Sequence, residues 1–399
     1  MTGNASRGPT RWGALMATAA LVAAIGLGAP SGAPAEAAAS SGVDLPLATS
    51  VQSAAGTWAT LPMGHLNQTL NTFWQLFFRA SGTTSWVDQV RNMAVATNGG
   101  LAFASATGQP FIAAVRPSNL LHFSPLIFTT DGGRTWSDGV VPQGLAASLA
   151  ALSTSPDGRT LALVDTGSGP RVLASTSNLS TWRTLTTAGE LASGKDGESC
   201  GLRTLSAVAS LGGHAVVGAR CTRPGVVGIF VQAAGDWELE GPTLPRSLVP
   251  QGVRVLTLES TSSGLTALLR TSGKSGAALV AAWTTRGGQW SVSRPLSLSA
   301  HEHLVSIGPA SGGGLFVLLK TSPGSARLSV IDGPTALWRQ LPAPPRDTAT
   351  VAFDPGSVAT MDALVAHDTT MTTWSLAAGA NTWAKGQVLH VEIKFGSSQ

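Results

Sequence analysis

The stretch Thr129–Trp136 reads TTDGGRTW and places an aspartate, two glycines and a tryptophan close together. This composition is typical of a tight turn, because an aspartate carboxylate accepts hydrogen bonds from nearby backbone N–H groups and glycine tolerates a positive φ. The indole of Trp136 can then pack against the hairpin and fix the next strand. A calcium loop would need several more oxygen ligands than Asp131 offers. We therefore interpret the stretch as a structural turn and expect no metal.

Seven tryptophans recur at a spacing that indicates a structural repeat. They are Trp86, Trp136, Trp182, Trp237, Trp290, Trp338 and Trp383, which stand 45 to 55 residues apart. Each tryptophan follows an apolar run and a small polar turn and precedes a short strand-like stretch. The alternative, a β-sandwich with scattered tryptophans, would not predict this regularity. The repeat therefore sets the fold class.

Three or four short strands per repeat is the size of one β-propeller blade. One blade cannot bury both faces of its sheet, so blades stack radially. We predict an all-β fold with a single propeller over residues 45–396 and seven blades, and we find no helical periodicity in the mature chain. Eight or six blades are the alternatives, since VQSAAGTW (residues 51–58) imitates a later repeat.

A propeller ring must be closed, or its terminal strand edges stay open to aggregation. An additional hairpin, Leu47–Leu61, precedes the first complete turn, and an additional apolar strand, QVLHVEIKF (residues 387–395), follows the last repeat. We predict that these N- and C-terminal strands join in the blade that ends at Trp86.

The first 37 residues have the pattern of a secretory signal peptide. Arg7 and Arg11 precede an apolar run from Ala14 to Leu27, and small residues follow up to Ala37. The run is shorter than the roughly 20 residues of a membrane span, although a retained anchor is the alternative. We predict cleavage near Ala35–Ala37, a linker over residues 38–44 and a secreted, extracytoplasmic protein with no membrane span.

Cys200 and Cys221 are the only cysteines of the chain. In an exported protein an isolated pair favours a disulfide over two free thiols. The sequence between them predicts a hairpin that turns at Leu211–Gly213 and brings its ends together. The bridge would contribute roughly 3 kcal/mol by closing this loop.

TTDGGRTW matches the pattern Ser/Thr-x-Asp-x-Gly-x-Ser/Thr-Trp at Thr129, Asp131, Gly133, Thr135 and Trp136. In this respect the chain resembles the sialidase-type, or BNR-repeat (Asp-box), β-propellers, and the other six turns resemble degenerate copies. The resemblance implies that this Asp box joins the two outer strands of a blade, away from the face where ligands bind.

Sialidases use a tyrosine nucleophile, and this chain contains no tyrosine. Sialidase activity is therefore not expected. A hydrolase that uses two carboxylates is the alternative, but the candidate acids are scattered and stand mostly next to turns. They are Glu198, Glu238, Glu240, Glu259 and Glu302.

The repeat also identifies candidate ligand-binding residues at the polar end of the second strand of successive blades. They are Arg116, Asp165, Arg220, Arg270, Lys320 and His367. Such strand ends open on the face opposite the Asp-box turn, so we expect a partial ring of mostly cationic side chains there. A ring of this kind favours a carboxylate, sulfate, phosphate or acidic glycan. The alternative is that these charges only solvate loops.

The sequence predicts a secreted, non-catalytic propeller that binds an anionic ligand, an acidic glycan or a protein partner at the cell envelope. A carboxylate-dependent glycan hydrolase and an assembly or scaffolding factor are the alternatives. Nucleotide-binding, zinc-protease and serine-hydrolase motifs are missing, so we expect no cofactor and no catalytic residues. His301 and His303 form an HxH pair without an evident third metal ligand. We expect a monomer that binds no nucleic acid.

Overall fold

The computed structural model describes residues 43–64, 72–89, 100–106, 108–116, 122–175, 178–246, 249, 251–261, 264–273, 276–285, 288–322, 325–354 and 360–392. The predicted signal peptide (residues 1–37) and most of the predicted linker lie outside these residues. Residues 41–399 form one compact unit. Its described part is built almost entirely of β-strands, which confirms the predicted fold class.

Three sheets each contain four strands that are consecutive in the chain and antiparallel. The first contains β5 (Leu101–Ala104), β6 (Phe111–Val115), β7 (Ser124–Thr129) and β8 (Ser137–Val141). The second contains β9 (Leu152–Thr154), β10 (Thr160–Asp165), β11 (Pro170–Ser175) and β12 (Arg183–Thr187). The third contains β26 (Thr348–Asp354), β27 (Thr360–His367), β28 (Thr370–Ala377) and β29 (Ala384–His390).

Two larger sheets each join two groups of consecutive strands. One contains β1 (Val43–Ser53), β2 (Gly56–Gly64), β3 (Thr72–Ala80), β4 (Trp86–Asp88), β22 (His303–Pro309), β23 (Leu315–Ser322), β24 (Ser325–Ile331) and β25 (Arg339–Gln340). The other contains β13 (Leu202–Leu211), β14 (His214–Cys221), β15 (Ile229–Ala233), β16 (Asp236–Leu239), β17 (Val253–Ser260), β18 (Gly264–Gly273), β19 (Gly276–Thr285), β20 (Ser291–Val292) and β21 (Leu296–Ser297).

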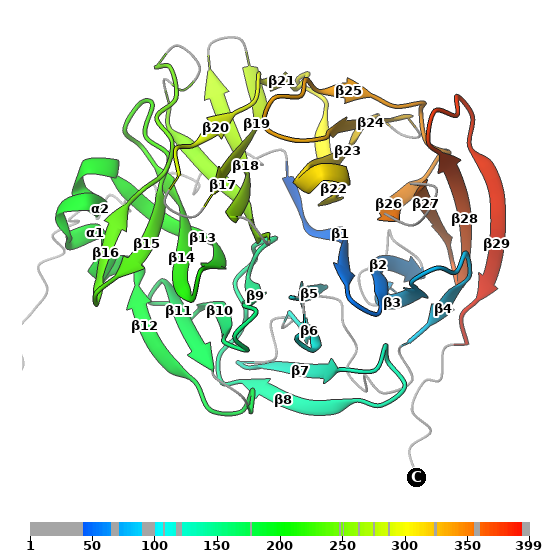
Figure 1. Ribbon diagram of the computed structural model, residues 1–399, viewed down its shortest axis with the longest axis horizontal. Helices are drawn as coiled ribbons and strands as arrows, with labels where there is room; N and C mark the ends of the chain where they lie inside the picture. Colours follow the sequence, from blue (N-terminus) through cyan, green and yellow to red (C-terminus); the bar gives the residue numbers. More distant parts are fainter. Residues whose placement is uncertain are drawn as a thin grey trace, which may run out of the picture. The chain divides into compact units, whose positions relative to one another are not determined.

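The strand groups follow one another around a ring in sequence order (Figure 1). β1 links two of them, because it pairs antiparallel with β2 and parallel with β22. Central strands are buried on both faces, as in β6 with its sequence FIAAV. Outer strands such as β8 are largely solvent-facing. The core therefore lies between neighbouring sheets and explains the continuous apolar runs of the second strands.

The seven periodic tryptophans mark the outermost strand of each group, as predicted. Trp86 begins β4, Trp237 lies in β16, and the other five directly precede β8, β12, β20, β25 and β29. Four of the indoles bond to the neighbouring group. Trp182, Trp290, Trp338 and Trp383 donate their Nε1–H to the carbonyls of Val140, Glu240, Arg294 and Pro342, at 2.7, 2.6, 3.0 and 3.2 Å. The tryptophans thus fasten successive groups together.

The predicted way of closing the ring is wrong for the described residues. β29 pairs with β28 in its own four-stranded sheet, and β1–β4 complete the Trp86 group without a C-terminal strand. Each tryptophan is followed by its own outer strand, so residues 384–390 are the fourth strand of the last group and not an additional one. β4 and β29 instead lie side by side (Figure 1), and the Gln387 side chain bonds to the Trp86 N–H and carbonyl at 2.8 and 3.0 Å.

Two short α-helices contradict the expectation of a chain without helices. They are α1 (Ala188–Ser193) and α2 (Lys195–Cys200), and Ser311–Gly313 adds a 3-10 turn, η3. Thr187 and Glu190 form a capping box at the start of α1. Six-residue helices are too short to show a 3.6-residue period, but the TAGE sequence of this box was a readable signal. Among the described residues, no helix has the length and apolar character needed to cross a bilayer.

Candidate functional site

The TTDGGRTW turn joins β7 to β8, the two outer strands of its group, as the resemblance implied. Asp131 Oδ1 accepts hydrogen bonds from the N–H groups of Arg134 and Thr135, each at 3.0 Å. Its Oδ2 accepts from Thr135 Oγ1 at 2.7 Å. These bonds, chiefly those from Thr135, hold the pKa of the Asp131 carboxyl well below its usual range. Both carboxylate oxygens serve the turn itself, which agrees with a structural role.

The six predicted ligand-binding residues lie at or just after the ends of second strands. Arg116 follows β6, Asp165 ends β10, Arg220 lies in β14, Arg270 in β18, Lys320 in β23 and His367 at the end of β27. In an antiparallel group these ends point opposite to the turn between the third and fourth strands. The residues therefore share the end of the sheets that was expected for them.

The structure brings two of these residues together through a third arginine that the sequence analysis missed. Arg220 of β14 pairs in register with Arg254 of β17, and Arg254 pairs with Arg270 of β18. We call Arg220, Arg254 and Arg270 the arginine ladder. Arg254 is the second residue of β17, the first strand of its group, so a comparison of second-strand ends could not find it. The unusual pairing of β14 with β17 creates the ladder.

The arginine ladder concentrates positive charge without neutralising it. Arg220 is exposed, whereas Arg254 and Arg270 are half-buried. Burial lowers the pKa of Arg254, and the positive charge of Arg220 lowers it further. The pKa of Arg270 is likewise lowered, first by burial and then by the charge of Arg254. Among the described residues, no carboxylate forms an ion pair with the three guanidinium groups. Like charges held at adjacent positions destabilise a sheet unless an anion binds them.

Two nitrogens of the arginine ladder carry an additional cost. Arg254 Nε and Arg270 Nη1 are buried and make no hydrogen bond in the structure. An unsatisfied buried donor on a charged group costs more than about 1–3 kcal/mol. A carboxylate, sulfate or phosphate oxygen would satisfy these donors and offset the repulsion at once. The ladder therefore has the chemistry of an anion-binding site.

Arg116 occupies a separate environment. It is 5% exposed, and its Nη2 donates to the carbonyl of Ser148 at 2.5 Å, while Nε and Nη1 are buried without a partner. Burial lowers its pKa to about 10, so the group stays charged at neutral pH. Among the described residues, no hydrogen bond joins Arg116 directly to the arginine ladder; a chain of hydrogen bonds through Ser148 and Ser206 ends at Val255, next to Arg254.

The remaining predicted residues do not extend the ladder into a uniform ring. Asp165 Oδ1 accepts from the Gly167 N–H at 3.2 Å and caps its own turn. His367 is highly exposed and lies 3.3 Å from the carboxylate of Asp368. Lys320 stands opposite His303 across the β22–β23 pair. Acidic groups thus interrupt the expected ring, and the cations gather over β14, β17 and β18.

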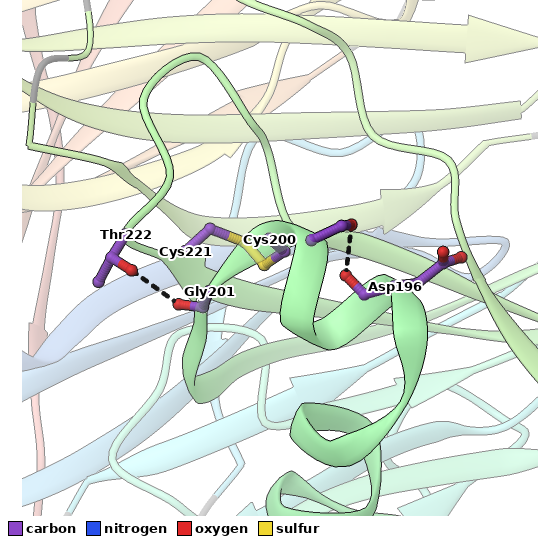
Figure 2. Close-up of a disulfide and its surroundings, with 6 residues drawn as sticks. Asp196, Cys200, Gly201, Cys221 and Thr222 are labelled. Atoms are coloured by element: carbon purple, nitrogen blue, oxygen red, sulfur yellow. Dashed lines mark hydrogen bonds between the residues drawn. A yellow bond between two sulfur atoms is a disulfide. The ribbon is translucent and has the colours of Figure 1, made fainter.

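The disulfide Cys200–Cys221 is confirmed, and it lies beside the arginine ladder. It connects the end of α2 to the end of β14 (Figure 2), and Cys221 directly follows Arg220 in the sequence. The hairpin between the cysteines turns at Gly212–Gly213, as predicted. Thr222 Oγ1 donates to the Gly201 carbonyl at 3.0 Å beside the bridge. The bridge fixes the strand end that carries Arg220.

The acids that a hydrolase would need are dispersed. Glu198 lies on α2, Glu238 on β16 and Glu240 just after it, all exposed. Glu302 forms an ion pair with Arg327, with Oε1 2.7 Å from Nε. Within the described ranges, no three His, Cys, Asp or Glu side chains lie close enough together to hold a metal ion.

Glu259 differs from the other acids because burial raises its pKa to about 7. Between about pH 4.5 and pH 7, Glu259 is therefore protonated in the folded protein and ionised in the unfolded chain. The free energy of unfolding falls as the pH rises through this window. We expect Glu259→Gln to be more stable than the wild type by about 1–3 kcal/mol near pH 8, with little difference near pH 4.5. Urea titrations at both pH values would measure this, and a constant difference would contradict it.

Sheets that follow one another around a ring, with apolar cores between them, define the β-propeller class. No known family model and no curated protein matches the chain. Among solved structures, a GH74 xyloglucanase from Xanthomonas campestris has a TM-score of 0.55 at 13% identity over 82% of this chain. A putative 6-phosphogluconolactonase from Bacteroides fragilis has a TM-score of 0.50 at 11% identity, with 84% of this chain and 95% of that chain covered.

The Aleuria aurantia lectin, described as a six-bladed propeller that recognises fucose, is a more distant match. It has a TM-score of 0.42 at 12% identity over 88% of this chain and 96% of its own. The match to the xyloglucanase spans about half of that enzyme, 51% of its chain. The similarities to the xyloglucanase and the lactonase establish the propeller fold and leave function to the residues of this chain.

Proposed function

We propose that the protein is an extracytoplasmic, non-catalytic β-propeller that binds an anionic ligand at the arginine ladder. The observation that carries the proposal is the set of three adjacent arginines on β14, β17 and β18 that have no carboxylate partner in the described structure. Two of their nitrogens are buried donors without an acceptor. A structural arginine would normally satisfy these donors within the protein.

The ligand class follows from guanidinium chemistry. Arginine presents its donors in a planar fork that matches carboxylate, sulfate and phosphate oxygens two at a time. Three forks on neighbouring strands suit a ligand with several anionic groups, such as an acidic glycan, or an acidic patch on a protein partner. The exposed Arg220 would make the first contact, and the half-buried Arg254 and Arg270 would supply the tighter bonds.

The architecture that we propose around this site is a ring of seven blades of the BNR-repeat type. The blades would be β1–β4, β5–β8, β9–β12, β13–β16, β17–β21, β22–β25 and β26–β29. The buried Cys200–Cys221 disulfide supports export to an oxidising compartment after cleavage of the signal peptide. We propose a monomer, because the ring would satisfy its own strand edges.

The test is retention on immobilised heparin, a sulfated glycan. We expect Arg254→Gln/Arg270→Gln to weaken heparin binding by roughly 100-fold or more, because each of the two lost charge-assisted hydrogen bonds is worth about 1.5–3 kcal/mol and about 1.4 kcal/mol is a factor of ten. Wild-type binding should also fall steeply with added salt.

The matched control is Arg134→Gln, since Arg134 is an exposed arginine in the TTDGGRTW turn at the opposite end of its sheet. This variant loses positive charge without changing the ladder and should bind heparin almost as the wild type does. Equal weakening by both variants would show a general charge effect and would overturn the proposed site.

Glu259 is the one observation that favours the second candidate, a glycan hydrolase. A glutamic acid with a pKa near 7 can act as a general acid. It stands five residues from Arg254 along β17, about 17 Å away at the rise of a strand. Glu259 therefore lies outside the arginine ladder. Release of reducing sugar from polysaccharides that depends on Glu259 would support the hydrolase instead.

A further inference from the structure

Trp374 of β28 departs from the pattern of its strand position. It stands opposite Lys385, two residues after the periodic Trp383. In the other groups the equivalent third-strand residue pairs with the position two residues after the periodic tryptophan. These equivalents are all buried, at most 7% exposed: Phe77, Ile127, Leu173, Phe230, Ala282 and Ser329. Trp374 alone among them is only half-buried.

A groove of about 620 Å³ explains this exposure. It is lined by Trp374 and Trp383 together with the segment after β25, which includes Pro342 and Arg346. The turn between β28 and β29 contributes Asn381 and Thr382. We call this cavity the tryptophan groove. Its size is within the range of ligand sites, roughly 300–1,000 Å³.

The polar residues of the groove are available to a ligand. Arg346, Asn381 and Thr382 are exposed. Across the part of the chain that the structure describes, no ion pair involves Arg346 or the neighbouring Lys385. The indole N–H of Trp383 is already bonded to the Pro342 carbonyl, so Trp383 forms a fixed wall. The ring of Trp374 is only half-buried, unlike its six buried equivalents, and is therefore open to a ligand.

We propose that the tryptophan groove binds an acidic saccharide, with a sugar ring stacked on Trp374. The apolar C–H face of a pyranose fits a flat indole, as with other amphipathic partners of tryptophan. The amide of Asn381 and the hydroxyl of Thr382 both donate and accept, which suits sugar hydroxyls. Arg346 and Lys385 supply positive charge for a uronic carboxylate. The groove is formed by β28, the turn between β28 and β29 and the segment after β25, none of which carries an arginine of the ladder.

A proline-rich peptide is the competing occupant, because such peptides also dock in aromatic grooves. Two exposed side chains that both donate and accept, Asn381 and Thr382, and the donors of Arg346 favour a ligand rich in hydroxyl groups. The probes are therefore oligogalacturonides, neutral cello-oligosaccharides and a proline-rich peptide, each titrated calorimetrically into the full-length protein.

We expect the oligogalacturonide to bind roughly tenfold more tightly than the cello-oligosaccharide, because its carboxylates meet two cations. Trp374→Ala should weaken both sugars by roughly tenfold or more through loss of the stacking surface. Arg346→Gln should remove the preference for the acidic sugar. Leu337→Ala, a truncation of an apolar residue that is 62% exposed, lies between β24 and β25 and does not line the groove, is the control and should bind as the wild type does.

Trp374 also packs against a buried cluster, so its replacement can affect folding. Arg346→Gln/Asn381→Ala changes only exposed side chains and keeps the test decisive if Trp374→Ala does not fold. Wild-type sugar affinity in this double variant would overturn the proposal. So would a wild-type protein that binds neither sugar, or that binds the proline-rich peptide alone. Arg254→Gln/Arg270→Gln should keep full sugar binding in the groove, so failure of the ladder and failure of the groove are distinguishable.

Discussion

Replacing Asp362 with alanine is expected to lower the free energy of unfolding by about 3–5 kcal/mol, because it leaves a buried arginine without its main partner. Arg79 of β3 is 3% exposed, and its Nη1 bonds to Asp362 of β27. Asp362 also accepts from Trp86 Nε1 at 2.9 Å and from Ser375 Oγ at 2.6 Å. The carboxylate therefore holds the first and last strand groups together.

Additional contacts show why this cluster closes the ring. The Arg79 guanidinium carbon lies 5.0 Å from the centroid of the Trp86 ring, and Arg79 Nη2 lies 3.3 Å from Asp354. The Trp86 indole donates to the Asp362 carboxylate, whereas the other four inter-group tryptophans donate to backbone carbonyls. Loss of Asp362 would leave three donors unsatisfied at a junction where, among the described residues, a single backbone bridge, Gly64–Asp368, joins the two groups.

Equilibrium urea unfolding would measure the effect. Asp332→Ala is the matched control, because its ion pair with Arg339 spans 3.2 Å between side chains that are 43% and 57% exposed. That pair should contribute no more than about 1 kcal/mol. Arg79→Met/Asp362→Leu should recover much of the loss by replacing the ion pair with apolar contacts. A loss from Asp362→Ala no larger than the control would contradict this account of closure.

The sequence predicted those features of the fold that repeat or are local. The tryptophan spacing identified the strand groups, since each of the seven tryptophans stands directly before, or within, the outermost strand of its group. TTDGGRTW predicted its own turn because all its hydrogen bonds lie within a few residues. The Cys200–Cys221 bridge was predictable for the same reason, as a hairpin brings its ends together.

Features that depend on pairing between distant segments could not be read in this way. Gln387 and Asp362 join the first and last strand groups through single side-chain hydrogen bonds. Single contacts of this kind produce no periodic pattern in the sequence. Arg254 joined the candidate site only because β14 pairs with β17, a register that composition does not encode. Trp374 looked like an ordinary strand residue until its six equivalents proved to be buried. The candidate sites therefore arise where the repeat is broken.

Removing the disulfide is expected to cost about 2–5 kcal/mol of folding free energy, the usual range for a native bridge. Cys200 and Cys221 are fully buried, with Cα atoms 5.3 Å apart and a sequence separation of 21. The bridge packs closely against Gly228, the residue before β15, since a Cβ at that position would lie 2.4 Å from Cys221 Sγ. Cys200→Ala/Cys221→Ala therefore loses both the covalent constraint and well-packed sulfur atoms.

The same variant should also weaken heparin binding, because Cys221 and Arg220 are adjacent at the end of β14 and pair with Val253 and Arg254. Urea unfolding with and without a reducing agent would measure the stability, and reductant should destabilise the wild type while leaving the variant unchanged. If the variant is destabilised but retains wild-type heparin affinity, the strand end does not depend on the bridge. The arginine ladder would then be held by the β14–β17 pairing alone.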